Sequence, residues 1–97
     1  MVFRSINRMV VVSGSVENGP EAKKDNLGRE LLSFWMRVSG DLYMIQFRGM
    51  MVHRAQHIAP GMRLFVQGSM FSKCFMGKDG MKHQVPLIVV FDFEVAD

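Results

Sequence analysis

The sequence has 97 residues, of which 48% are hydrophobic, so it is long enough to bury one small core and we expect a single domain over residues 1–97. It contains no apolar run of about 18 residues, so we expect no membrane span. Cys74 is the only cysteine, which excludes an intrachain disulfide and a cysteine-rich zinc site and is typical of a reducing, cytoplasmic compartment.

The net charge of +3 is concentrated in the middle of the chain. Residues 42–84 carry six Lys and Arg side chains against one Asp, whereas residues 85–97 carry three acidic side chains and no Lys or Arg. This concentration predicts a positively charged surface that binds a polyanion. The ten methionines are typical of an adaptable core or a shared interface, and core filling is the favoured interpretation.

Residues 7–17 are expected to form the first strand, because a run of three β-branched valines begins at Val10. Gly14 within it predicts a bulge or a sharp bend. Residues 18–30 are expected to form a polar loop, since Gly19-Pro20 interrupts any regular element. The cations of this loop are balanced by acidic residues, so a solvated loop is favoured over contact with a ligand; these cations are Lys23, Lys24 and Arg29.

Two further strands are expected at residues 31–39 and 42–49, joined by a short hairpin at Gly40-Asp41. In the earlier strand, alternation assigns one face to the core, namely Leu32, Phe34, Met36 and Val38. The opposite face carries Trp35 beside Arg37, which predicts a binding platform or a dimer contact. In the later strand, Tyr43, Ile45 and Phe47 share one face, and Met44, Gln46 and Arg48 share the other.

A short helix is expected over residues 50–59, where apolar residues recur at helical spacing and Pro60-Gly61 follows as a stop signal. His53 and His57 are four residues apart, which is a spacing of metal ligands on a helix. The glutamate of the HExxH motif and a third ligand are absent, so no metal site is expected.

The last two strands are expected at residues 62–71 and 86–95, connected by a basic hairpin over residues 71–84. Asp79-Gly80 is suited to the tight turn of this hairpin. Its cations alternate with aromatic rings, a pattern that suits the phosphates and bases of single-stranded nucleic acid. The alternative is a solvated hairpin whose lysines protect an exposed edge from aggregation.

The expected order is therefore three strands, one short helix and two strands. A helix between the third and fourth strands is the layout of the all-β, five-stranded OB-fold barrel. The sequence contains no internal repeat and no composition shift that would mark a domain boundary.

Several stretches together resemble the bacterial single-stranded DNA-binding proteins and their relative, primosomal replication protein N. The opening INRMVVVSGSVENGPE is similar to the family's first strand with its glycine, with one residue more than usual between Asn7 and Gly14. YMIQFRG and AQHIAPGMRLFVQGSM are similar to its third strand, helix and fourth strand, with Pro60 in place of the usual basic residue before Gly61. The hairpin FSKCFMGKDGMKHQ has Phe75 where the family carries an aromatic that stacks on bases.

The resemblance covers nearly the whole chain and implies an OB fold that binds single-stranded DNA. It also implies pairing of the first strand, from Asn7 to Val16, across a two-fold axis, in a homodimer or a dimer of dimers. The long DNA-contacting loop that the family often has in its second hairpin is reduced to Ser39-Gly40-Asp41. The sequence also ends after the fifth strand without the family's acidic tail, which resembles primosomal replication protein N.

Resemblance and chemistry both indicate non-enzymatic binding of single-stranded DNA in replication, recombination or repair, with RNA as the alternative strand. Lys and Arg neutralise phosphates, and aromatic faces stack on bases with little sequence preference. Phe47 and Phe75 lie at matched family positions, although the shared face with Ile45 makes Phe47 equally a core candidate. The candidate binding residues are Trp35, Arg37, Phe47, Arg48, Phe71, Lys73, Phe75, Lys78 and Lys82.

Two other functions are weighed against strand binding. The first is a protein–protein adaptor on the OB scaffold, because primosomal relatives bind replication proteins as well as DNA. The second is an enzyme, which is not expected because the reactive side chains form no triad, carboxylate pair or Cys/His arrangement. No cofactor is expected. The reactive side chains are Asp41, His53, His57, Cys74, Asp79 and His83.

Overall fold

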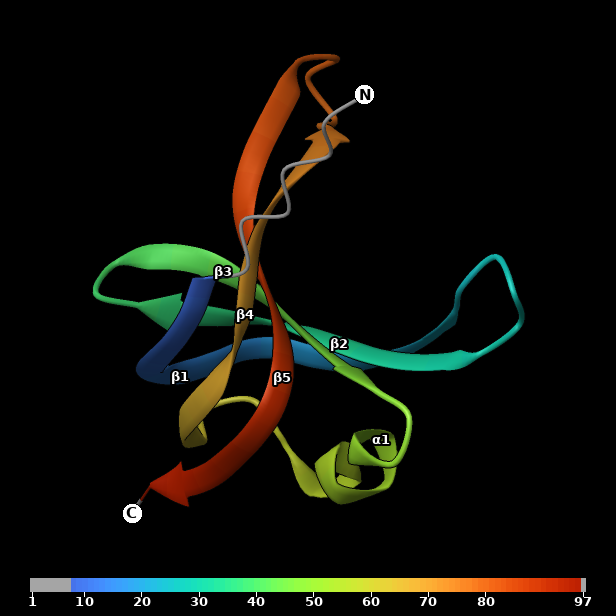
Figure 1. Cartoon of the computed structure of the whole chain (residues 1–97). Coiled ribbons are helices and arrows are strands. Elements are labelled where there is room, and N and C mark those ends of the chain that lie inside the picture. The colour runs from blue at the N-terminus through green and yellow to red at the C-terminus, as the bar shows by residue number, and fades with distance from the viewer. Residues whose placement is uncertain (1–7, 97) are drawn as a thin grey trace.

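A computed structural model describes residues 8–96 of the chain (Figure 1). It contains five strands, one short α-helix and one 3-10 turn. In chain order these are β1 (Arg8–Lys24), β2 (Glu30–Val38), β3 (Asp41–Arg48), α1 (Met51–Arg54), η1 (Ala55–His57), β4 (Arg63–Met76) and β5 (Lys82–Ala96). Asn7, with which the first strand was expected to begin, lies outside the described residues.

The five strands form a closed barrel in the order β1-β2-β3-β5-β4. β3 and β5 pair in parallel, and all other neighbours pair antiparallel. The helix lies between β3 and β4 in the sequence. This arrangement confirms the expected five-stranded OB-fold barrel.

The core is built from the inward-facing residues of all five strands together with the helical segment. The expected inward face of β2 is confirmed, since Leu32, Phe34 and Met36 are buried and Val38 packs against them. The core also includes Val16, Ile45, Phe47, Val52, Ala55, Ile58, Leu64, Val66, Ile88 and Val90. Val52, Ala55 and Ile58 are buried against the barrel core, and the helical segment, residues 51–57, is shorter than the expected helix over residues 50–59.

The prediction of a loop over residues 18–30 is wrong for most of that range, because β1 continues to Lys24. β1 accommodates Gly19-Pro20 through two register shifts in its pairing with β2. One lies between Val16 and Asn18 and the other between Asn18 and Glu21. Proline is tolerated at such irregular positions because no ladder hydrogen bond is required from its nitrogen. Only residues 25–29 form a turn.

Gly14 is not itself the site of a bulge, since the register shifts of β1 follow it. It pairs with Leu64 of β4 immediately before β1 begins to pair with β2. A Cβ atom at this position would overlap the carbonyl oxygen of Arg37. The glycine therefore allows close approach of two backbones where β1 changes partners.

Two antiparallel ribbons project from the barrel. In Figure 1 the end of the β1–β2 ribbon extends to the right and the β4–β5 ribbon rises above the barrel. The latter, residues 71–87, is called the β4–β5 arm; within it β4 and β5 pair from Phe71 opposite Leu87 to Met76 opposite Lys82. Its turn places Gly80 at φ 78°, as expected for Asp79-Gly80. No helix among residues 8–96 is long and apolar enough to cross a membrane.

Candidate nucleic-acid interface

Cross-strand pairing places four outward-facing residues in a row over β2, β3, β5 and β4. Trp35 pairs with Met44, Met44 pairs with Leu87, and Leu87 pairs with Phe71. Because paired residues project on the same side of a sheet, these side chains form one continuous strip. This strip, called the aromatic row, has Trp35 at one end and the exposed Phe71 at the other.

Three rings connect the aromatic row with the β4–β5 arm. The ring centroids of Trp35 and Phe75 lie 6.2 Å apart, with an interplanar angle of 58°. The ring of His83 stacks on Phe75 as well, at 5.5 Å and 28°. Phe75 is 37% exposed, so part of its side chain is accessible to a planar ligand. This ring series forms an aromatic surface that runs from the barrel onto the arm, of the kind on which bases can stack.

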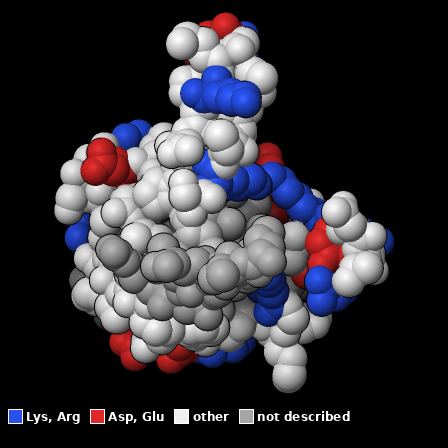
Figure 2. All heavy atoms as spheres, turned by 45° about the horizontal axis from the view of Figure 1, so that its top comes forward, with Lys and Arg blue, Asp and Glu red and all other residues white. Residues whose placement is uncertain are grey.

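The three lysines of the arm do not share one face. Lys73 lies on the same side of the ribbon as Phe75, and its Nζ atom is 3.8 Å from Sδ of Met44. Lys82 pairs with Met76 and so projects from the opposite side, while Lys78 lies in the turn. Figure 2 shows Lys and Arg side chains on the arm and in a band from its base toward the end of the β1–β2 ribbon.

The two arginines of the interface differ in how they are held. Arg37 is engaged within the chain, because its Nη2 atom lies 3.2 Å from Oε1 of Glu17 and its Nη1 donates to the carbonyl oxygen of Gly40 at 3.0 Å. Arg48 is exposed and donates from Nε to Oε1 of Gln46 at 2.8 Å. The contact orients its guanidinium group while leaving the terminal nitrogens of Arg48 for an anion.

Phe47 is not part of the interface, and its assignment as a stacking residue is wrong. Its side chain is 0% exposed and packs in the core. The Phe47 ring stacks on Phe34 at 5.6 Å and meets Phe93 edge-on at 5.2 Å. A two-residue turn at Ser39 and Gly40 sets the register in which Phe47 pairs with Leu32 on the inward face.

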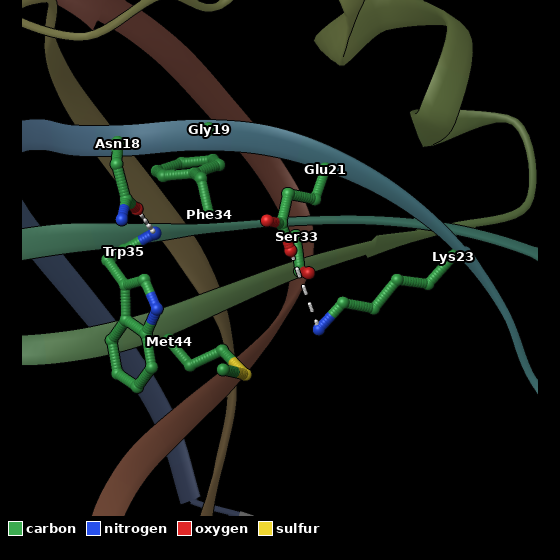
Figure 3. A pocket seen from close by; sticks show the side chains of 8 residues that line it. All are labelled: Asn18, Gly19, Glu21, Lys23, Ser33, Phe34, Trp35 and Met44. Atoms are coloured by element: carbon green, nitrogen blue, oxygen red, sulfur yellow. Dashed lines mark hydrogen bonds and ion pairs between the residues drawn. The ribbon is translucent and has the colours of Figure 1, made fainter. Parts of the chain in front are cut away.

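A hollow of ≈ 50 Å³ adjoins Trp35 between the β1–β2 ribbon and β3 (Figure 3). The backbone N–H of Trp35 donates to Oδ1 of Asn18 at 3.3 Å, which holds the irregular part of β1 against β2. Lys23 lies 3.9 Å from Glu21 at the other end of the hollow. Figure 3 shows the indole and Met44 beside each other at its edge. The hollow thus extends the surface next to Trp35 toward β1.

Asp79 organises the turn of the arm. Its Oδ1 accepts the backbone N–H of Met81 at 2.9 Å, and both its carboxylate oxygens lie 3.2 Å from Nε2 of His83. The hydrogen bond from Met81 and the contact with His83 lower the pKa of the Asp79 carboxyl below its usual value. This acidic group therefore stays ionised in the middle of a basic hairpin.

The turn of the β1–β2 ribbon is built in the same way around Asp25. Its Oδ1 accepts the backbone N–H groups of Leu27 and Arg29 at 2.9 Å each, and its Oδ2 accepts from Nε of Arg29 at 2.7 Å. These bonds, the backbone bond from Arg29 first, lower the pKa of Asp25. Arg29 and Lys23 are therefore paired with carboxylates of the same ribbon.

His53 and His57 are both exposed on the short helical segment. Over residues 8–96, no group of three or more His, Cys, Asp or Glu side chains is arranged to hold a metal ion.

Sequence reasoning missed Met44 and left His83 out of the site. Met44 could have been found from the same short turn that pairs Phe47 with Leu32, because that register places Met44 opposite Trp35. His83 follows from the hairpin turn, which aligns it with Phe75. In both cases a turn sets the register of the two strands, and the residue type alone does not indicate the position.

No protein-family model matches the chain, and no curated protein matches its sequence. Solved structures do match. The small single-stranded DNA-binding protein from Streptomyces coelicolor superposes with a TM-score of 0.76 at 13% identity, covering 95% of this chain and 96% of that one. The SSB of Plasmodium falciparum, in complex with ssDNA, gives 0.69 at 19% identity and 100% of both chains. The S. cerevisiae mitochondrial single-stranded DNA-binding protein Rim1 gives 0.62 at 14% identity and 92% of both chains.

These matches define the class of fold. The chain has the OB fold of the single-stranded DNA-binding proteins over nearly its whole length, which confirms at the level of fold the resemblance seen in the sequence.

Proposed function

We propose that this protein binds single-stranded DNA, with little sequence preference and without enzymatic activity. The observation that carries the proposal is the ring series of Trp35, Phe75 and His83, which joins the barrel face to a basic arm. Stacking on aromatic rings is tolerant of sequence because every base has a π-face, and each stacked base contributes about 1–3 kcal/mol. Lys73 and Arg48 on the same side of the sheet supply phosphate contacts.

The structural neighbours support strand binding over the adaptor function. All three are named as single-stranded DNA-binding proteins, and one was solved with ssDNA. OB folds bind oligonucleotides on the β2–β3 face, between the loop after β1 and the loop after β4. In this chain the aromatic row and both projecting ribbons occupy that region. A role in DNA replication, recombination or repair, a cytoplasmic location and contacts with replication or primosome proteins belong to the same proposal.

The proposal includes a homodimer. Residues 8–14 of β1 pair with β4, whereas pairing of β1 with β2 begins only at Ser15, so one edge of that segment has no partner among the described strands. An exposed strand edge favours pairing with another chain. Two-fold pairing at this edge would join two barrels in one sheet, and a dimer of dimers is the larger alternative.

Equilibrium titration of fluorescein-labelled oligo-dT, of duplex DNA and of RNA of equal length, each at two salt concentrations, tests the function. We expect oligo-dT to bind more tightly than duplex DNA, with an affinity that falls as the salt concentration rises. Equal affinity for duplex DNA, or no binding of either single strand, would contradict it.

A further inference from the structure

His83 is held at the tip of the arm by two different contacts. One face of its ring stacks on Phe75 at 5.5 Å, and its Nε2 atom lies 3.2 Å from both carboxylate oxygens of Asp79. Its side chain is still 45% exposed. The imidazole is therefore fixed in orientation and remains accessible to a ligand on the ring series.

Gly77 makes room for this arrangement. A Cβ atom at Gly77 would lie 2.7 Å from Cδ2 and Nε2 of His83 and 2.8 Å from Oδ1 of Asp79. Any other residue would displace the ring or the carboxylate. The contact between His83 and Asp79, as it stands, therefore depends on a glycine at position 77.

We propose that His83 contacts the bound strand and that protonation of its imidazole raises the affinity of this protein for single-stranded DNA. The inference rests on the proposed function and extends it to a dependence on pH. Histidine is the side chain whose charge ordinarily changes near neutral pH. A neutral imidazole on Phe75 supplies only a stacking surface, whereas an imidazolium ion adds a positive charge beside the phosphates.

Charged groups of the turn, of β4 and of β5 lie around His83. From the turn, the Asp79 carboxylate lies 3.2 Å from Nε2 of His83 and carries the opposite charge to an imidazolium ion. From β4, Lys73 lies diagonally across the ribbon on the same side, and Lys78 of the turn is a second cation. On β5 itself, Lys82 projects from the side of the ribbon opposite to His83. Trp35 of β2, which contacts Phe75, carries no charge.

Bound phosphates add negative charge next to the imidazole and so favour its protonated form. The gain in affinity is present at low pH and disappears as pH rises through the titration of the imidazole. One exposed ion pair corresponds to a change in affinity of about two- to fivefold.

The test is the dissociation constant for labelled oligo-dT at about pH 8.0 and about pH 5.5, at constant ionic strength, because imidazole changes charge between these values while Lys and Arg do not. Thymine takes up no proton in this range. The variant His83→Phe retains an aromatic ring and removes the titrating group. His57→Phe is the matched control, since Figure 1 shows the helical segment at the opposite end of the barrel from the arm.

We expect the parent and His57→Phe to bind about two- to fivefold more tightly at the lower pH, and His83→Phe to lose this difference. An undiminished pH dependence in His83→Phe, or none in the parent, would overturn the inference while leaving the proposed function intact. Failure of the parent to bind oligo-dT at either pH would overturn both.

Discussion

The indole ring of Trp35 on β2 and the phenyl ring of Phe75 on β4 lie 6.2 Å apart between centroids. This contact ties the β4–β5 arm to the outer face of the barrel. The arm therefore continues the surface of the aromatic row instead of forming a separate basic hairpin.

Replacing Phe75 by alanine should weaken oligo-dT binding by about 1–3 kcal/mol and leave the fold intact, because the change removes a stacking surface from an exposed side chain. Fluorescence titration measures the loss, and circular dichroism checks the fold. Phe65→Ala is the matched control: Phe65 is 48% exposed and lies ten residues earlier on β4, about 33 Å along the strand. Unchanged affinity in folded Phe75→Ala would remove Phe75 from the site.

Neutralising Lys73, Lys78 and Lys82 together should make the dependence of log K on log salt shallower, by about 0.7 for each phosphate that the variant no longer neutralises. Of the single variants, Lys73→Gln should have a larger effect than Lys82→Gln, because only Lys73 shares the side of the ribbon with Phe75. Arg63→Gln, at the far end of β4, serves as the charge control. A slope identical to that of the parent would mean that the lysines of the arm are only solvated.

Phe47→Ala should lower the free energy of unfolding by about 3–5 kcal/mol, since it opens a cavity between Phe34 and Phe93. Chemical denaturation measures this loss. The milder Phe47→Leu should stay folded and bind oligo-dT as the parent does. A selective loss of affinity in folded Phe47→Leu would return Phe47 to the binding site.

Light scattering at micromolar concentration should give a mass of at least twice 11.1 kDa, because the edge of residues 8–14, which has no partner among the described strands, favours pairing with a second copy. A mass of 11.1 kDa would contradict the dimer.

Much of the barrel could be predicted from the sequence because apolar residues alternate along β2 and the first half of β4. Leu32, Phe34 and Met36 face the core as their spacing indicates, and the helical segment lies where the alternation breaks. The length of β1 could not be predicted, since Gly19-Pro20 normally ends a strand. Here the pairing of Asn18 and Glu21 with β2 carries the strand through two register shifts, which local sequence does not reveal.

The site was predictable only in part, for a related reason. Trp35 was suggested by strand alternation and Phe75 by its position in the family motif, but their contact depends on how the arm lies against the barrel. The prediction for Phe47 was wrong because its place in the family motif indicates stacking, whereas alternation makes it equally a core residue. The register of the short turn places its side chain on the inward face. Side chains such as Arg37 also find partners within the chain that no spacing rule shows.

Trp35 is the only tryptophan of the chain, so its intrinsic fluorescence reports on the ring series alone. The most direct test of the proposed interface is its emission during titration with unlabelled oligo-dT, with duplex DNA of equal length as the comparison. Stacking of bases on Trp35 and Phe75 should give saturable quenching with oligo-dT and much less with the duplex. Emission that stays unchanged while labelled oligo-dT is shown to bind would place the strand on another surface and contradict the proposed interface.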